Sequence, residues 1–307
     1  MSNLRDRIEQ GKFVITAEIV PPLSASSAPL LAEAAVLGSA VQAINVTDAA
    51  AGRTSMSSFA AAAMLRAGGY EPILQVTCRD RNRIALAGEL LGAAAQGIEN
   101  VLVLHGDDPS GGDQPDAKPV FDFNSGELMA VIRDMRDKGQ LPSERKIDSP
   151  PNFFIGGADV PQVPGPDWNP GRQLAKIEAG AGFMQTQFCF DVETGRAYME
   201  RLAKEGISDR VGMILGVGPI RSAKSARWMN DNLFGVHVPD SVIDRLEQAE
   251  DQGEEGKRFC AELIQSLQQI PGVAGVHIMA PGGGVKSIAA VLAALPADFR
   301  EGAVARR

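Results

Sequence analysis

Short runs of β-branched and other apolar residues alternate with longer Ala- and Leu-rich segments of helical periodicity from one end of the chain to the other. This alternation is typical of βα units built around a parallel sheet. Eight strands are predicted, at residues 13–19, 41–46, 71–77, 100–104, 152–155, 183–188, 211–217 and 273–279.

Helical patterns fill the intervals between the predicted strands. They lie at residues 27–38, 54–67, 82–97, 124–138, 170–180, 192–205, 222–233 and 284–294, with two more at 239–250 and 253–269. Eight strands with helical crossovers favour an α/β fold of the closed (β/α)8 TIM barrel type over an open doubly wound sheet, which is the alternative. We expect a single domain over residues 1–307, with insertions near 108–122 and 140–151 and extra helices near 239–269.

Composition narrows the class of protein. Thirty Lys and Arg against 38 Asp and Glu give a net charge of −8, which argues against nucleic acid or an anionic membrane as the main partner. The cysteines Cys78, Cys189 and Cys260 lack CxxC spacing, as buried thiols of a reducing compartment do. The N-terminus has no apolar signal region and no run of 18 apolar residues occurs, so a cytoplasmic protein is expected.

In a barrel the ligand site lies at the carboxyl ends of the strands, so polar residues there are the candidate functional residues. Glu18 is a lone carboxylate in the apolar run Ala17–Pro22. Apolar surroundings favour the protonated form of a carboxyl group, which would suit Glu18 to deliver a proton near neutral pH. A surface glutamate at a strand end is the alternative interpretation.

Other predicted strands also end on polar residues. The sixth ends on the segment Gln185–Gln187, where the uncharged amide of Gln187 can read the donor and acceptor edge of a heterocycle. Thr47 offers a hydroxyl after the second strand, and the segment His105–Asp107 follows the fourth, with a glycine that allows close backbone approach. Turn and capping roles explain these residues equally well.

No metal site is expected. The three histidines, His105, His237 and His277, have no paired Cys/His spacing. The run Gly282–Gly284 before the last helix is suited to cradle a phosphate, and a flexible turn is an equal alternative.

Taken together, the strand ends resemble those of the methylenetetrahydrofolate reductase family, and the resemblance covers nearly the whole chain. Several motifs in one order are far more specific than any single motif. The motifs are Ala17–Pro22, Val46-Thr47, Val76–Cys78, His105–Asp107, Lys176–Ala181, Thr186–Phe188 and Asp191.

The resemblance implies a catalytic barrel that carries FAD at the carboxyl ends of its strands. It implies hydride transfer from NAD(P)H to the flavin and then to 5,10-methylenetetrahydrofolate, giving 5-methyltetrahydrofolate, or the reverse oxidation. The implied partners are a tetrahydrofolate derivative and NADH or NADPH, with no nucleic acid and no membrane. The choice of nucleotide, the direction and the formation of a homo-oligomer stay open.

The resemblance also assigns roles residue by residue. Glu18 matches the acid that protonates folate N5, Asp107 the carboxylate near the pterin and the flavin, and Gln187 the amide that binds the folate ring. Lys176 matches a cationic partner for the FAD phosphates or ribose. The full set of positions that match FAD contacts is Thr47, Gln75, Leu104, His105, Gly106, Asp107, Phe121, Asp122, Gly157 and Lys176.

The departures from the best-known bacterial members concentrate on these flavin contacts. Gln75 stands where they have His, His105 where they have Arg, and Gly157 where they have Tyr. Their Asp and Asn in the fifth helix fall on Asn169 and Arg172. These differences suggest a divergent branch of the family and bear directly on the affinity for FAD.

Three functional hypotheses follow. The first is a reductase in which FAD carries the hydride, and the second is a version with weak or no FAD, in which NAD(P)H reduces the folate directly in a ternary complex. The third is a noncatalytic folate-binding barrel of a methyl-transfer complex. The presence of Glu18, Asp107 and Gln187 favours an enzyme, because a scaffold needs no proton donor in the barrel mouth; another flavin barrel, such as an amino-acid dehydrogenase, is a more distant alternative.

Overall fold

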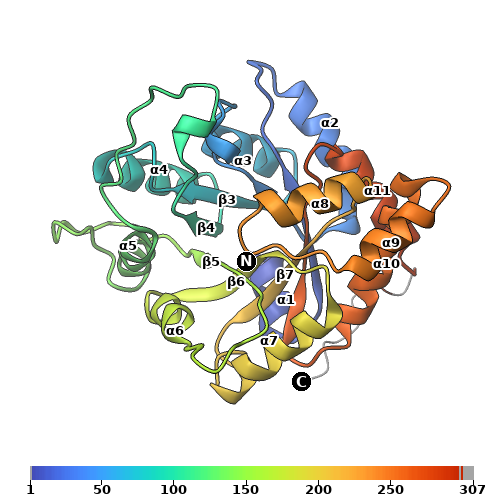
Figure 1. Ribbon diagram of the computed structural model, residues 1–307. Helices are drawn as coiled ribbons and strands as arrows, with labels where there is room; N and C mark the ends of the chain where they lie inside the picture. The colour runs from blue at the N-terminus through green and yellow to red at the C-terminus, as the bar shows by residue number, and fades with distance from the viewer. Residues whose placement is uncertain (1, 297–298, 300–307) are drawn as a thin grey trace.

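Each strand pairs in parallel with the next strand along the chain, and the eighth strand closes the ring on the first. The computed structural model describes residues 2–296 and 299. Figure 1 shows the ring of strands with helices around it, so the predicted (β/α)8 barrel is confirmed. The strands are β1 Val14–Ile19, β2 Ala43–Val46, β3 Pro72–Thr77, β4 Asn100–Leu104, β5 Phe154–Asp159, β6 Ala181–Phe188, β7 Gly212–Val217 and β8 Val273–Ile278.

Helices follow the strands as the periodicity predicts, and side chains directly after the strands cap several of them. The amide oxygen of Asn82 accepts from the backbone N–H groups of Ile84 and Ala85, and Asp191 caps the helix after β6 in the same way. The helices are α1 Asn3–Glu9, α2 Ala28–Leu37, α3 Ser58–Ala67, α4 Arg83–Ala95, α5 Ser125–Asp137, α6 Gly171–Glu178, α7 Val192–Lys204, α8 Ala223–Asn232, α9 Asp240–Gln248, α10 Gln252–Gln268 and α11 Gly284–Ala294.

The barrel interior changes in character along its axis. Alternation along the strands sends every second side chain inward. Towards the amino ends these side chains form an apolar cluster with α1, and two positions further along several strands they become polar and stay buried, as at Thr16, Asn45 and Gln185. The apolar cluster consists of Leu4, Val14, Ala43, Ile73, Leu102, Phe154, Phe183 and Ile214.

Helix α1 closes the amino end of the barrel and lies near the centre of the ring in Figure 1. The carboxylate of Glu71 accepts from the backbone N–H groups of Asn3 and Leu4 at 2.9 Å each, and from the hydroxyl of Ser2 at 2.7 Å. A carboxylate at a helix N-terminus satisfies N–H groups that have no partner within the helix. The sequence patterns do not predict this helix, because its stability comes from residues far along the chain.

Strand β5 extends four residues beyond the predicted 152–155. The prediction ends the strand at the glycine pair that follows Ile155, because glycine weakens a strand interior. In the structure Gly156 lies within the strand, and a Cβ there would overlap the ring of Phe183 on β6. The glycine therefore makes room for the apolar layer inside the barrel rather than ending the strand.

Two loop segments and two helices lie outside the regular repeat. The loop between β4 and α5 carries one short 3₁₀ turn at Pro109–Gly111, and residues 140–146 form an isolated antiparallel bridge before β5. Helices α9 and α10 are the extra helices between α8 and β8. Within residues 2–296, none of the helices combines the length and the apolar character that crossing a bilayer requires.

Candidate active site

Glu18 is the last inward-facing residue of β1, and its side chain is 23% exposed at the carboxyl end of the barrel. The neighbouring strand β8 places His277 beside it, with 3.9 Å between His277 Nε2 and Glu18 Oε2. The imidazole of His277 is buried, whereas the carboxylate of Glu18 is partly exposed at the mouth of the barrel. The two side chains therefore form a pair at the boundary between the barrel core and its mouth.

A chain of buried polar groups crosses the interior beneath Glu18. Thr16 Oγ1 lies 2.9 Å from His277 Nδ1 and accepts from Gln185 Nε2 at 3.2 Å. Gln185 and Asn45 exchange two hydrogen bonds, of 2.6 Å and 3.2 Å. Buried polar groups are costly unless they are paired, and a fully connected network fixes each member in one orientation.

Two further predicted residues face the same end of the barrel. Gln187 lies two positions beyond Gln185 on β6, and its Oε1 accepts from the backbone N–H of Phe188 at 3.0 Å. The Thr47 hydroxyl is buried and has no hydrogen-bond partner among residues 2–296. Leaving a buried hydroxyl unpaired costs free energy, so this oxygen is free to bond a ligand that enters the mouth.

Asp107 and the adjacent loops are tied together by Arg79. Asp107 Oδ2 accepts from the backbone N–H of Ala51 at 2.6 Å. The buried guanidinium of Arg79 donates to the carbonyls of Asp107 and Ala49 and pairs with Asp80. These bonds join the loops after β2, β3 and β4 at the mouth.

Gly106 has a positive φ of 101°, and a Cβ there would lie 2.8 Å from Arg79 Cβ. Its backbone conformation and the packing of Arg79 therefore both require glycine. Local backbone geometry and packing are therefore enough to explain the glycine at position 106, and no bound ligand is needed to explain it.

The arginines after β3, the densest basic cluster of the sequence, are neutralised by neighbouring carboxylates. Arg81 pairs with Asp48 and with Glu89. Arg83 forms a bidentate ion pair with Asp122, with a shortest N···O distance of 2.8 Å. The hydrogen bonds from Arg83 lower the pKa of the Asp122 carboxyl to about 2. Asp122 is thus engaged within the protein.

The loop after β4 places an aromatic pair at the mouth. The rings of His105 and Phe121 stack at a centroid distance of 4.4 Å and an interplanar angle of 9°. Phe121 has a φ of 44°, a backbone conformation that non-glycine residues adopt rarely and that marks local strain. Leu104 is half-buried at the end of β4, and Gln75 is buried on β3 two positions beyond Ile73.

Lys176 of α6 donates a hydrogen bond to the carbonyl of Ala158 at the end of β5. Burial lowers the pKa of its ammonium group. Gly157 faces the helix side of β5, where a Cβ would touch Lys176 and Met129. Lys176 therefore lies at the carboxyl end, and Gly157 lies behind it rather than in the barrel interior.

Sequence reasoning missed the residues that surround Glu18. The sequence patterns assign no role to Thr16 and Asn45 and consider His277 only as a metal ligand. They place Gln185 at the end of the sixth strand without predicting its partners. The common feature of these residues is visible in the sequence: each is a polar residue in an otherwise apolar strand, and Thr16, Asn45 and Gln185 lie two positions before Glu18, Thr47 and Gln187. In the described part of the chain no three or more His, Cys, Asp and Glu side chains come together in a way that could hold a metal ion.

Thiol chemistry does not fit this site. Cys189 follows β6 closely, but burial raises the pKa of its thiol to about 12, and burial also raises the pKa of Cys78 to about 11. A thiolate is therefore scarce near neutral pH at both positions.

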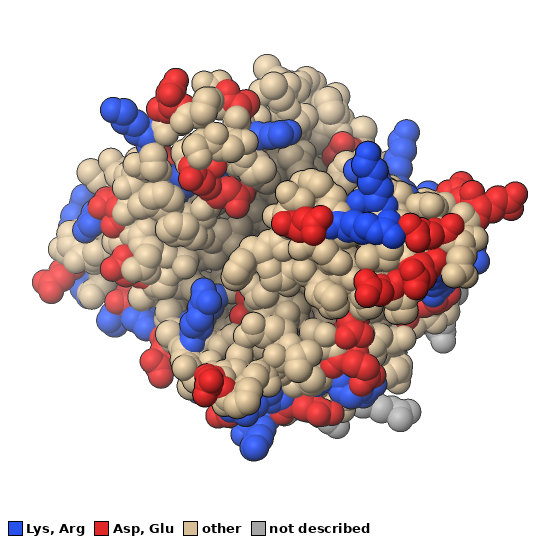
Figure 2. Space-filling view, viewed as in Figure 1, with Lys and Arg blue, Asp and Glu red and all other residues tan. Residues whose placement is uncertain are grey.

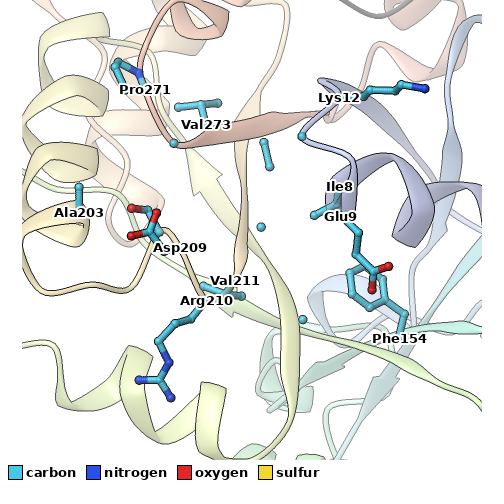
Figure 3. Close-up of a pocket in the computed structure, with 16 residues that line it drawn as sticks. Ile8, Glu9, Lys12, Phe154, Ala203, Asp209, Arg210, Val211, Pro271 and Val273 are labelled. Carbon is cyan, nitrogen blue, oxygen red and sulfur yellow. The ribbon is translucent and has the colours of Figure 1, made fainter. Parts of the chain in front are cut away.

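A cavity of about 520 Å³ lies at the opposite, amino end of the barrel. Figure 3 shows Ile8, Glu9 and Phe154 on one side of it and Asp209 and Val211 on another. Barrel enzymes bind their ligands at the carboxyl end, so we assign no catalytic role to this cavity.

In the view of Figure 2 the surface is hollowed near its centre, while most charged side chains lie around the periphery.

Parallel strands in a closed ring, with an acid, an amide and an unpaired hydroxyl at their carboxyl ends, define a (β/α)8 barrel of the class that binds ligands at this end. Sequence comparison identifies the branch of this class. The family model for methylenetetrahydrofolate reductase matches residues 3–293, and the chain belongs to this family, as predicted.

Individual relatives are distant. The chain is 26% identical over 234 residues to a probable methylenetetrahydrofolate reductase (NADPH) of Caenorhabditis elegans, covering 74% of this chain but 32% of that protein. It is 25% identical over 212 residues to 5,10-methylenetetrahydrofolate reductase of Salmonella typhimurium, covering 68% of this chain and 64% of that protein. The chain thus spans about a third of the worm protein and under two thirds of the bacterial one.

Among solved structures, the barrel is similar to an uncharacterized protein from Clostridium thermocellum that binds two copies of 5-methyl-5,6,7,8-tetrahydrofolic acid. The TM-score is 0.63 at 15% identity, and the match covers 98% of this chain and 99% of that one. At this identity the likeness supports the fold alone.

Proposed function

We propose that this protein transfers a hydride between NAD(P)H and 5,10-methylenetetrahydrofolate, with 5-methyltetrahydrofolate as the other folate, and that FAD carries the hydride. Membership of the family supports the reaction class. The observation that carries the proposal is the position of Glu18, whose carboxylate reaches the barrel mouth above a network of buried, hydrogen-bonded polar side chains. A proton donor fixed at this end is what the reaction needs and what a passive folate carrier does not.

The residues at the mouth fit FAD in part. The Thr47 hydroxyl is buried and without a partner in the described chain, Leu104 offers an apolar surface, and Lys176 provides a cation at the end of β5. These three residues would hold the cofactor, with Asp107 and Gly106 alongside. When bound, FAD would accept a hydride from NAD(P)H and pass it on. Asp122 and the His105–Phe121 pair already have protein partners and contribute less.

Glu18 supplies the proton. Reduction of the folate breaks the bond between the methylene carbon and N10, adds a hydride to that carbon and leaves a proton on N10. The proton from Glu18 therefore ends on N10, and not on N5, the nitrogen that the family resemblance implies. A carboxylic acid beside the five-membered ring delivers this proton as the ring opens, and becomes a carboxylate. Gln187 binds the donor and acceptor edge of the pterin and so orients the ring for this transfer.

The proposal is tested with the purified protein, supplied with FAD and with NADH or NADPH. We expect oxidation of the nucleotide to depend on methylenetetrahydrofolate and to yield 5-methyltetrahydrofolate, identified by chromatography. Absorbance at about 450 nm, measured before and after FAD is added, shows whether the protein holds flavin. Turnover that depends on bound flavin indicates the FAD route, and turnover without flavin indicates direct transfer from NAD(P)H. Binding of the folate without turnover would instead support the noncatalytic barrel.

The Glu18→Gln variant tests the assignment of the acid. We expect folate reduction to fall by at least about 100-fold, as for loss of a general acid, while oxidation of NAD(P)H by a quinone continues. The matched control is Glu193→Gln, which alters an exposed carboxylate in the first turn of α7. Folate turnover at the parent rate in Glu18→Gln would contradict the role of Glu18.

A further inference from the structure

We propose that His277 is a positioning residue for Glu18: the buried network directs an imidazole proton to Nε2, and this N–H stabilises the Glu18 carboxylate that proton donation creates. The proposal rests on the proposed function for its catalytic consequence. Its structural part, the tautomer, stands on hydrogen bonds alone.

The direction of the hydrogen bonds follows from the amide at the far end of the network. Asn45 Nδ2 donates to Gln185 Oε1, and the Gln185 amide nitrogen donates both to Asn45 Oδ1 and to Thr16 Oγ1, at 3.2 Å each. The Thr16 oxygen thus acts as an acceptor towards Gln185. Its own proton must point to a different partner.

Two acceptors compete for the Thr16 proton. His277 Nδ1 lies 2.9 Å from Thr16 Oγ1, whereas the carbonyl of Val276 lies 3.5 Å away, at the limit of a hydrogen bond. We assign the Thr16 proton to Nδ1, the shorter contact; in the opposite tautomer Nδ1–H would donate to Thr16 and the hydroxyl would donate to Val276. A neutral imidazole that accepts at Nδ1 carries its proton on Nε2, the nitrogen that faces Glu18.

The distance between His277 Nε2 and Glu18 Oε2, 3.9 Å, is longer than a hydrogen bond. His277 is locked by Thr16 and by burial, while the Glu18 side chain reaches into the mouth. The proposal requires the Glu18 side chain to rotate until its oxygen lies within hydrogen-bond distance of this N–H. This bond becomes charge-assisted only after Glu18 has given up its proton, so it stabilises the product side of proton transfer more than the starting acid.

The test uses two substitutions of His277 that place an amide N–H differently. In His277→Gln the side-chain amide nitrogen falls near the former Nε2, and in His277→Asn it falls near the former Nδ1. We expect His277→Asn to lower kcat for folate reduction by about tenfold, and His277→Gln to keep most of it. The folate KM and quinone reduction should change less than about twofold in both variants, because Glu18 acts in the folate step alone.

Two further variants complete the design. Thr16→Val removes the donor to Nδ1 and should lower kcat for folate in the same direction as His277→Asn. The matched control is His237→Gln, an exposed histidine between α8 and α9, which should leave all rates unchanged. Full activity in both His277 variants, equal loss in both, or a parallel loss of quinone reduction would each overturn the positioning role.

The tautomer is measured without any turnover. In protein labelled with ¹⁵N-histidine, we expect the His277 ring to show a protonated Nε2 and an unprotonated Nδ1 near neutral pH, and Thr16→Val to change this pattern. A proton on Nδ1, or an imidazolium, would overturn the inference. This readout separates the two proposals, since absence of folate reduction in the parent protein rejects the proposed function and leaves the tautomer measurable.

Discussion

The inner site and the outer rim of the barrel mouth differ in how their polar groups are held. The inner site, Thr16, Glu18, Asn45, Gln185, Gln187 and His277, sits on strands, and its buried members bond to one another across the barrel. The outer rim consists of His105, Asp107, Phe121 and Asp122 in the loop after β4 and Lys176 on α6, and its members contact neighbouring backbone or side chains.

This difference separates the two ligands of the proposed reaction. A folate ring can meet Glu18 and Gln187 without breaking the network below them, so the inner site is preorganised for substrate. FAD at the outer rim must displace contacts such as that of Lys176 with the Ala158 carbonyl. Each displaced contact subtracts from the binding free energy. We therefore expect the contacts already made at the outer rim to weaken binding of the cofactor more than binding of the substrate.

Among the variants that test this contrast between the inner site and the outer rim, Gln185→Leu is expected to have the largest effect. Gln185→Leu leaves Thr16 and Asn45 with buried unpaired groups, which costs about 1–3 kcal/mol of unfolding free energy, measured by urea denaturation. Folate turnover should fall more than about tenfold because His277 loses its fixed orientation. The control Gln265→Leu changes a half-buried glutamine on α10 and should be nearly neutral. Parent stability in Gln185→Leu would contradict a preorganised network.

A smaller effect is expected at Gln187, which lies at the mouth and is not part of the buried network. Gln187→Ala should raise the folate KM about tenfold, equivalent to about 1.4 kcal/mol, with little change in stability, because one ligand-facing amide is lost. Steady-state kinetics at fixed NAD(P)H measure this change. An unchanged KM would show that Gln187 does not touch the folate.

The comparison also explains what the sequence could and could not predict. Most strands and helices follow from periodicity, because each burial face repeats along a local segment. Strand β5 was drawn too short, since Gly156 looks like a strand end until the ring of Phe183 is seen to fill its place. Helix α1 was missed because Glu71, distant in sequence, stabilises its first turn.

The inner site and the outer rim also differ in how much of their arrangement could be predicted from the sequence. Glu18 and Gln187 occupy strand positions whose direction is fixed by alternation, so their location at the mouth was predictable. The partner of Glu18 was not, because a closed barrel predicts that β8 adjoins β1 but not the register that places His277 beside Glu18. The contacts of Asp107 and Asp122 depend on loop conformations, which local patterns do not determine.

At the outer rim, Lys176 gives a still smaller expected effect. Lys176→Met should weaken FAD binding by about threefold to tenfold, since the cation that faces the cofactor is lost while its bond to Ala158 no longer has to be displaced. Titration of FAD with flavin fluorescence measures this without turnover. Lys138→Met, on an exposed lysine paired with Asp134, is the matched control. A loss of folate affinity in place of FAD affinity would reverse the assignment of the two regions.

The smallest effect is expected at the exposed ion pair of the outer rim, Arg83 with Asp122. Hydrogen bonds from Arg83 lower the pKa of Asp122 to about 2, below its ordinary value of about 3.9, so the folded state favours the charged carboxylate. Its contribution to stability is present above about pH 4 and is lost as the pH falls towards about 2. Asp122→Asn should therefore lower Tm slightly at neutral pH, and the difference from the parent should shrink on acidification in this window.

Salt distinguishes this pair from the inner site. Both partners are solvent-accessible, so added salt should also reduce the difference in Tm between Asp122→Asn and the parent. The buried amide network of Gln185 carries no net charge and should respond little to salt. Thermal unfolding at low and high ionic strength checks both expectations. A large, salt-insensitive loss of Tm in Asp122→Asn would show that the outer rim is as preorganised as the inner site, and the contrast between the two regions would fail.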